Sequence, residues 1–146
     1  MDTSSQADPT RSSSTDAALL LLRIACGLVF IYHGSAILFG AFDGPGPEKF
    51  AAGMHAPVLT GYLVGLAQFG GGLAVLTGIL IRLGALCIVV VMFGAIFLVH
   101  LQHGFEVAKG GIEFALTMLL IAFALFLTGA GSYSLAGQLP ESMRKL

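Results

Sequence analysis

Four long apolar runs occupy almost the whole chain after residue 16, separated by three short polar stretches. A helix needs about 20 mainly apolar residues to cross the hydrocarbon core of a bilayer. Only helices and closed barrels can cross lipid, and the alternating pattern of barrel strands is absent from this sequence. The sequence therefore predicts an all-α, polytopic membrane protein, an antiparallel bundle of four transmembrane helices. The expected spans are 17–39, 58–80, 83–101 and 112–127.

The composition agrees with a membrane protein and limits its partners. Hydrophobic residues make up 56% of the 146 residues and charged residues only 10%. The mean hydropathy of +0.91 lies well outside the usual balance of a soluble domain. The formal net charge of −1 offers no basic surface for nucleic acid. The first expected partner is the lipid bilayer, and the length suits one domain.

The chain is expected to divide into one membrane domain and two polar ends. Residues 1–16 are polar and rich in Ser and Thr, with nothing apolar to bury, so they predict a disordered cytoplasmic tail. The membrane domain is expected over 17–135, followed by a cytoplasmic C-terminal tail over 136–146. Thr15 or Asp16 can serve as the N-cap of the first span.

The basic residues predict the orientation of the chain in the membrane. Four spans place both termini on one side, and Lys49 and Lys109 on the other. The side of the termini holds the other five basic residues: Arg11, Arg23, Arg82, Arg144 and Lys145. An excess of Lys and Arg marks the cytoplasmic side, so both termini are expected in the cytoplasm. Arg23 is interpreted as an anchor whose long side chain reaches the interface.

Several polar residues are expected at one depth, near the outer ends of the spans. At a rise of about 1.5 Å per residue, His33 and His100 both reach the outer edge, and Glu113 opens the last span on the same side. Ionisable groups in a bilayer are costly and often functional, so this layer is the predicted ligand-binding site. The candidate residues are His33, His100, Glu113, Tyr32, His103 and, deeper in the second span, Gln68.

Other interpretations of these residues remain open. His and Tyr at span ends also occur simply at the headgroup interface, and Glu113 suits the N-terminus of a helix. The spacing of His100, His103 and Glu106 is compatible with metal ligands, but spacing alone does not assign a metal. A histidine–carboxylate pair could instead bind a quinone head group or carry protons.

Small residues within the spans have packing interpretations. Gly61 and Gly65 form a GxxxG pattern, and three glycines follow at 70–72. They predict close helix packing or, alternatively, a narrow ligand groove. Cys26 and Cys87 lie in apolar runs without a CxxC pattern and are interpreted as small buried thiols. The sequence does not decide whether either has a redox role.

The order of several short motifs resembles the DoxX family of small bacterial membrane proteins. The resemblance covers about 19–135, through LLRIACGLVFIYHG, GPGPEKFAA, LAQFGGGLAVLTGILIRLGA, FLVHLQHGF and KGGIEFAL. It implies a four-helix bundle in the bacterial inner membrane. The recurring positions that it implies are Arg23, His33, Gly34, Gly71, Gly72, Gly78, Arg82, His100, Gly104, Gly111 and Glu113.

The resemblance also implies an association with redox chemistry. Relatives include quinone-reducing subunits of thiosulfate oxidation and partners in membrane complexes that handle oxidative or thiol stress. The leading hypothesis is therefore a quinone-linked oxidoreductase subunit, or a membrane partner of one, which could also form a homo-oligomer. The alternative is a non-enzymatic scaffold or a small transporter-like bundle. Many relatives carry an acid where Gln68 stands, so a mechanism that needs a mid-membrane carboxylate is in doubt.

Overall fold

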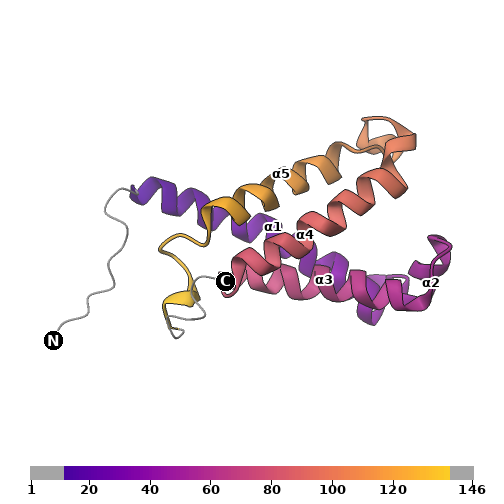
Figure 1. Ribbon diagram of the computed structural model, residues 1–146, viewed down its shortest axis with the longest axis horizontal. Coiled ribbons are helices and arrows are strands. Elements are labelled where there is room, and N and C mark those ends of the chain that lie inside the picture. The colour runs from indigo at the N-terminus through magenta and orange to yellow at the C-terminus, as the bar shows by residue number, and fades with distance from the viewer. Residues whose placement is uncertain (1–11, 139–146) are drawn as a thin grey trace.

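The computed structural model describes residues 12–138 (Figure 1), and residues 1–11 and 139–146 lie outside that description. The described chain is helical and contains no strand, which confirms the predicted all-α class. Its α-helices are α1 (Ser13–Phe39), α2 (Gly46–Gly53), α3 (Val58–Thr77), α4 (Ile81–Ala95) and α5 (Glu113–Thr128). A π-helical turn (Ile96–His100) and a 3₁₀ turn (Leu101–His103) extend α4, and further 3₁₀ turns are Ala41–Asp43, Val107–Lys109 and Leu135–Gln138.

Three helical stretches of the described chain are long and apolar enough to cross a membrane. They are Ser13–Phe39, Val58–Thr77 and Ile81–His103, the last being α4 with its extension. The fourth predicted span corresponds to α5, which is apolar but has 16 residues, fewer than the roughly 20 that a span needs. The structure therefore gives an all-helical protein with three candidate membrane spans and one shorter apolar helix.

The first helix begins earlier than the sequence predicted. The Oγ atom of Ser12 accepts the N–H of Thr15 at 3.3 Å, so Ser12 is the N-cap of α1. The prediction that Thr15 or Asp16 caps the helix was wrong, because Ser12 already satisfies a free N–H of the first turn. Asp16 instead lies within α1, where it is buried. Ser12 and residues 13–16 of the expected disordered tail therefore belong to α1 and its cap, and the rest of that prediction falls on residues that lie outside the described chain.

Glycines bring the backbones of α1 and α3 together along the most extensive helix–helix contact. A Cβ atom on Gly34 would overlap the backbone of Phe69, and one on Gly72 would lie 2.7 Å from the backbone N of Ile31. Gly65 faces the side chain of Leu38 at a similarly short distance. The predicted close packing of helices through glycine is confirmed at this contact.

A short link joins α3 and α4 into the predicted antiparallel hairpin (Figure 1). Gly78 ends α3 with a left-handed φ of 78°, and its N–H donates to the carbonyl of Ala74. A Cβ atom on Gly71 would lie 2.9 Å from the carbonyl O of Gly84, so these two helices also pack closely. Arg82 lies in the first turn of α4.

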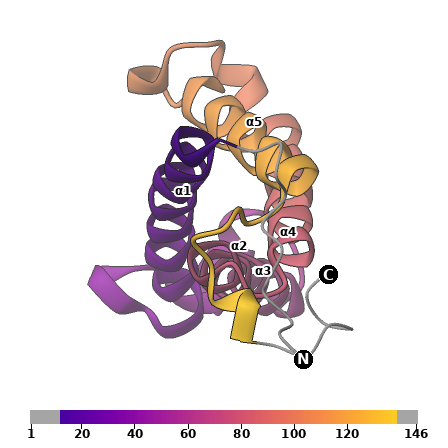
Figure 2. The same ribbon diagram turned by 90° about the vertical axis from the view of Figure 1, so that its left-hand side faces the viewer.

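Two helix pairs enclose a common interior. Figure 2 shows α1, α3, α4 and α5 around that interior, with α1 and α5 on opposite sides of its upper part. In Figure 1 the α4–α5 pair diverges from the α1–α3 pair away from the α3–α4 link. We call the end that carries this link the turn end. The opposite end, with α2 and residues 101–112, is the loop end.

The interior is mainly apolar. Its fully buried members include Phe30, Val75, Ile88, Ala122 and Leu125, one or more from each long helix. Burial of one such side chain contributes about 1.5–3 kcal/mol relative to exposure in water, although lipid reduces this contrast for a helix that is already inserted. Close packing is therefore the main source of stability between these helices, and polar groups inside them require specific partners.

Candidate functional site

One face of α1 carries a stripe of residues spaced alternately by three and four. The stripe consists of Asp16, Leu19, Arg23, Cys26, Phe30, His33 and Ile37. Residues at these spacings lie above one another on a helix, so all seven face the interior. All are buried except His33. The stripe thus places two charged residues near the turn end and a histidine near the loop end.

The guanidinium of Arg23 is enclosed at the turn end, where the side chain is 2% exposed. Its Nε donates to the carbonyl O of Val75 at 3.0 Å, and its Nη2 donates to that of Leu76 at 2.7 Å. Its Nη1 donates to the carbonyls of Ala130, at 3.0 Å, and Tyr133. The interpretation of Arg23 as an interface anchor was wrong, because carbonyls in the last turn of a helix lack an intrahelical donor and draw this side chain inward.

Asp16 binds the same segment beyond α5. Its Oδ1 accepts the backbone N–H of Ser132 at 3.1 Å, and its Oδ2 accepts the Ser132 hydroxyl at 2.6 Å. We call Asp16, Arg23 and residues 130–133 the turn-end lock. Sequence reasoning missed this lock, although the seven-residue spacing of Asp16 and Arg23 indicates a shared face. A charged side chain that donates to several carbonyls is strongly held, because charge-assisted hydrogen bonds are stronger than neutral ones.

At the loop end, His33 lies among aromatic rings. Its ring meets that of Tyr32 edge-on at a centroid distance of 5.4 Å and lies 6.5 Å from the ring of Phe114 at the start of α5. Tyr32 in turn stacks on Phe42, with 4.7 Å between the centroids. The structure therefore brings His33 and Tyr32 together with the N-terminal turn of α5. The imidazole remains exposed although it belongs to the interior stripe of α1.

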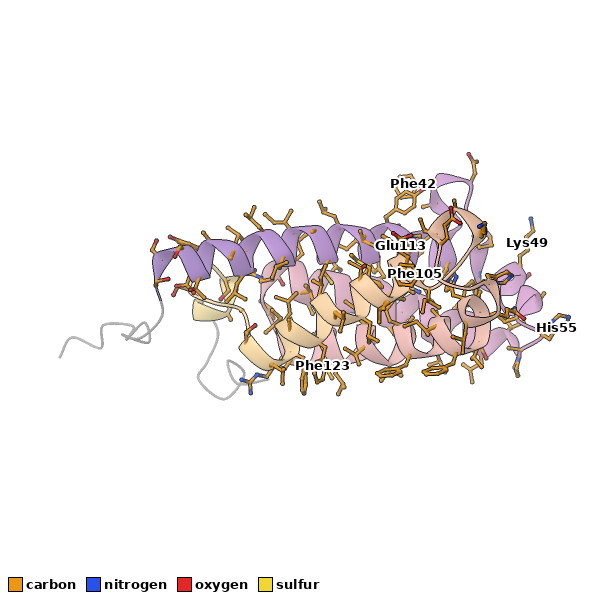
Figure 3. All side chains as sticks on the ribbon, turned by 90° about the horizontal axis from the view of Figure 1, so that it is seen from above. Phe42, Lys49, His55, Phe105, Glu113 and Phe123 are labelled. Carbon is orange, nitrogen blue, oxygen red and sulfur yellow. The ribbon has the colours of Figure 1, made fainter. Side chains whose placement is uncertain are left out.

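The other predicted residues of the outer layer bind their own loop. His100 donates through Nδ1 to the carbonyl O of Gly110 at 2.7 Å, and Glu113 accepts the N–H of Val107 through Oε2 at 3.0 Å. These bonds hold residues 101–112 against the ends of α4 and α5. Figure 3 shows Glu113 at the same end as Phe42 and Phe105. Ligand binding by His100 and Glu113 stays a prediction, and both have a structural use.

The weak candidates for metal ligation do not converge. His103 donates through Nδ1 to the carbonyl O of Val99 at 2.9 Å. Glu106 forms an exposed ion pair with Lys109 at 2.6 Å. Over residues 12–138 there is no group of three or more His, Cys, Asp or Glu side chains that could hold a metal ion. The spacing of His100, His103 and Glu106 therefore corresponds to local bonding of the loop.

Replacing Glu113 with alanine is expected to loosen this loop. The N–H of Val107 loses its acceptor, so its hydrogen exchange should become faster. Because the bond is exposed, the free energy of unfolding should fall by only about 0.5–1.5 kcal/mol. Hydrogen–deuterium exchange in detergent measures the effect, and Glu113→Gln, which keeps an acceptor oxygen, is the matched control. Unchanged exchange at Val107 in the alanine variant would contradict a structural role for Glu113.

Gln68 carries a buried oxygen without a hydrogen bond. Among the described residues, it is the only side chain with a fully enclosed polar atom that has no partner. The residue is 7% exposed, in the middle of α3, and its Oε1 has no partner. A buried oxygen left unpaired costs about 1–3 kcal/mol. The close approach of Gly34 to Phe69 puts Gln68 at the level of His33, because each neighbours one of these two residues. Sequence reasoning placed Gln68 well below the histidine layer, whereas the packing brings it level with His33.

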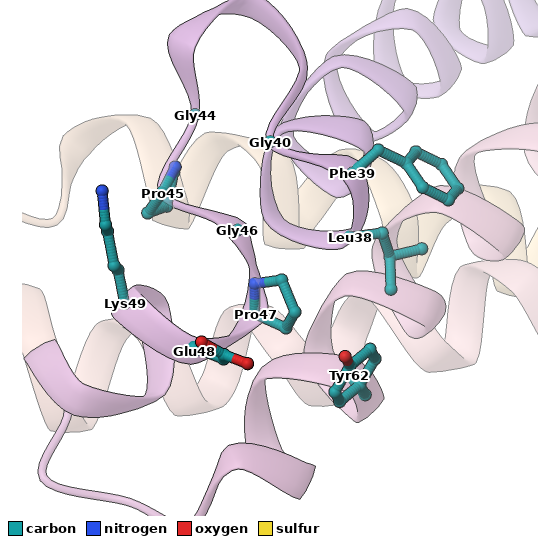
Figure 4. A pocket seen from close by; sticks show the side chains of 10 residues that line it. All are labelled: Leu38, Phe39, Gly40, Gly44, Pro45, Gly46, Pro47, Glu48, Lys49 and Tyr62. Carbon is teal, nitrogen blue, oxygen red and sulfur yellow. The ribbon is translucent and has the colours of Figure 1, made fainter.

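Two hollows lie elsewhere on the described surface. One, of about 330 Å³, lies at the loop end between residues 38–49 and Tyr62, and Figure 4 shows Glu48 pointing toward Tyr62 while Lys49 points away. The other, of about 390 Å³, is an apolar groove between α3 and α4 lined partly by Gly71 and Cys87. Neither is lined by His33, Gln68 or Glu113. Cys26 and Cys87 are both free thiols.

Comparison with known proteins identifies relatives of this chain. The family model described as DoxX matches residues 18–101. A protein of Bacillus subtilis (strain 168) named "Putative oxidoreductase CatD" is 29% identical over 120 residues, which cover 82% of this chain and 84% of that protein. No solved structure matches the chain.

Proposed function

The chain belongs to the DoxX family, and from that premise we propose that it is a quinone-linked subunit of a membrane oxidoreductase, or a membrane partner of a complex that handles redox or thiol stress. The relative named as an oxidoreductase supports the general class. Fold and family alone do not assign chemistry. The proposal therefore depends on the side chains around His33.

The surroundings of His33 are the observation that carries the proposal. A quinone head group is a flat ring with carbonyl oxygens, so it requires aromatic surfaces and a hydrogen-bond donor. Tyr32 and Phe114 supply the surfaces, and the exposed imidazole of His33 supplies a donor on the interior stripe. These residues fit the group and would hold its head. When bound, a quinone supplies the exchange of electrons together with protons.

The proposed placement in the membrane follows from the helices. We take α5 as a fourth span, because its 16 residues reach about 24 Å at 1.5 Å per residue, and lipid can thin around a short helix. The exposed Arg82 lies at the turn end, and Lys49 and Lys109 lie at the loop end. With Arg23 and with Arg11, Arg144 and Lys145 of the terminal sequences, the side of the termini carries five of the seven basic residues. This excess favours a cytoplasmic turn end with both termini, in a bacterial inner membrane. Protease digestion of a C-terminal tag from outside intact cells would overturn this orientation.

Replacing His33 with leucine is expected to weaken quinone binding at least tenfold, which corresponds to about 1.4 kcal/mol. The purified protein in detergent would be titrated with a short-chain benzoquinone. The chain has three tyrosines and no tryptophan, so quenching of tyrosine emission reports on Tyr32 beside the site. Aromatic contacts should preserve part of the affinity, because only the imidazole is lost.

His55→Leu is the matched control for this experiment. His55 is exposed in the segment between α2 and α3, so its loss should leave the titration unchanged. A wild-type protein that shows no saturable quenching by quinone would contradict the proposed function. Equal affinity in His33→Leu and wild type would exclude His33 from the site.

A non-enzymatic scaffold or small transporter-like bundle is the second candidate. The bonds of His100 and Glu113 within their own loop favour it, because they give both residues a use that requires no ligand. Under this alternative the partner complex would remain assembled with the His33→Leu variant. Loss of electron transfer from the complex without loss of assembly would argue for the quinone-linked function.

A further inference from the structure

We propose that the hollow at the loop end binds a primary ammonium group, in particular the ethanolamine head group of a phospholipid. This hollow lies between the last turn of α1, the start of α2 and Tyr62 of α3 (Figure 4), and we call it the α2 hollow. Its volume of about 330 Å³ corresponds to roughly ten water molecules, which is enough for a head group of a few heavy atoms. The inference is independent of His33 and of the proposed quinone chemistry.

The walls of the α2 hollow are held by close backbone contacts. Gly44 lies against Ala36 of α1, and a Cβ atom on Gly44 would overlap that residue. A Cβ atom on Gly61 of α3 would likewise overlap the carbonyl of Pro47. The segment that enters α2 is therefore fixed against both α1 and α3, so the hollow has a defined shape.

Two polar groups face the α2 hollow without a partner. Figure 4 shows the carboxylate of Glu48 pointing toward Tyr62, while Lys49 points away. Over the described residues, neither this carboxylate nor the Tyr62 hydroxyl takes part in a hydrogen bond or an ion pair. Both residues are exposed, so a ligand can reach them. An ammonium group carries three donors, so it can serve both oxygens at once.

The start of α2 favours a cation over an anion. A glutamate in the first turn of a helix often accepts the N–H of the N-cap residue, but the N-cap here is Pro45, which has no N–H. Pro47 also lacks an N–H, so few donors remain at this end for an anion. The positive end of a helix dipole amounts to about half a charge, which is less than the formal charge of Glu48. The carboxylate thus sets the sign of the ligand.

The position of the α2 hollow suits a lipid head group. Phe39 ends one helix that is long enough to cross a membrane, and Tyr62 lies in the second turn of another. Tyrosine at the end of a span is typical of the head-group interface. Glu48 and Lys49 have opposite charges and point in different directions (Figure 4). Phosphatidylethanolamine offers the complementary pair, with an ammonium for Glu48 and a phosphate within reach of Lys49.

The test measures lipid binding by the purified full-length protein. The probes are phosphatidylethanolamine, phosphatidylcholine and phosphatidylglycerol with identical acyl chains, because the second has methyl groups in place of the N–H donors and the third has no ammonium. Native mass spectrometry in detergent would count the bound lipids at each concentration. Free ethanolamine, titrated by calorimetry, tests a soluble amine as the source of the ammonium. The wild type should bind phosphatidylethanolamine at least fivefold more tightly than either other lipid.

Three variants assign this preference to the α2 hollow. Glu48→Gln keeps the size of the side chain, and the preference should fall below twofold, with no change in the unfolding temperature without lipid. Tyr62→Phe removes one acceptor and should reduce the preference two- to threefold. Asp43→Asn is the matched control, because Asp43 is an exposed acid outside the hollow and asparagine tolerates its left-handed φ of 58°. It should match the wild type.

Several results would overturn the inference. One is equal binding of the three lipids by the wild type together with no saturable titration by ethanolamine. Another is a preference for phosphatidylethanolamine that survives in Glu48→Gln, or that Asp43→Asn loses to the same extent. If ethanolamine titrates saturably, requires Glu48 and the lipids are not distinguished, the ammonium site stands and its ligand is a soluble amine.

Discussion

Replacing Arg23 with methionine is expected to lower the free energy of unfolding by about 3 kcal/mol or more, because several hydrogen bonds to a charged donor, each worth about 1.5–3 kcal/mol, are lost together. Four backbone carbonyls lose their donor at once, and two of them belong to the end of α3. The other two hold the segment after α5 in place, so this segment should detach from α1. Thermal or denaturant unfolding in detergent measures the loss, and membrane levels in cells should fall with it.

Two further variants define the cause of this effect. Arg23→Lys keeps the charge but has a compact ammonium in place of the planar fork, so it cannot serve carbonyls on both sides and should recover only part of the stability. Arg82→Met removes an exposed arginine at the same end, and surface substitutions are usually within about 0.5 kcal/mol. Equal stability of Arg23→Met and Arg82→Met would show that the turn-end lock contributes nothing.

Replacing Gly34 with alanine is expected to cost about 1–3 kcal/mol or more, because overpacking a close contact forces a shift. The new Cβ atom would overlap the backbone of Phe69, which cannot rotate away as the end of a side chain can. The helices α1 and α3 must therefore separate slightly, and the position of His33 on α1 relative to Gln68 on α3 changes as they do. Unfolding in detergent and crosslinking across α1 and α3 would measure both effects.

Gly70→Ala is the matched control for this substitution. A Cβ atom on Gly70 meets nothing within 4 Å, and alanine in a helix is favoured over glycine by up to about 1 kcal/mol. Stability should therefore stay constant or rise. If Gly34→Ala were as stable as Gly70→Ala, the close backbone approach between α1 and α3 would not be required.

Much of the fold could be predicted because apolar runs and turn residues are local signals. The long apolar stretches predicted the long helices, and their number and order predicted the antiparallel arrangement that α3 and α4 adopt. The short helix α2 was not predicted, because it lies between two of the apolar runs, in a segment rich in glycine and proline. Its Pro47 lies in the first turn, where proline is well accommodated. The start of α1 was also misplaced, since Ser12 and Thr15 are both suitable caps by composition alone.

The candidate site was less accessible to sequence reasoning, for a physical reason. The partners of Arg23 are backbone carbonyls from two distant segments, and backbone atoms leave no trace in the side-chain pattern. His33 could be singled out because a titratable group within an apolar run is costly. The hydrogen bonds of His100 and Glu113 depend on how residues 101–112 fold back between α4 and α5. This segment is a loop, so the helical spacing of side chains does not predict its path.

The position of Arg23 also determines when the fold can be completed during biosynthesis. A ribosome releases α1 first, yet the carbonyls of Ala130 and Tyr133 exist only when nearly all the chain has been made. Until then only the carbonyls of Val75 and Leu76 can accept hydrogen bonds from Arg23, so the set of bonds that holds α1 stays incomplete. The first helix and the segment after α5 thus reach their final arrangement together. A polypeptide that stops before Ala130 leaves the Nη1 atom of Arg23 without its two carbonyl acceptors, unlike the finished protein.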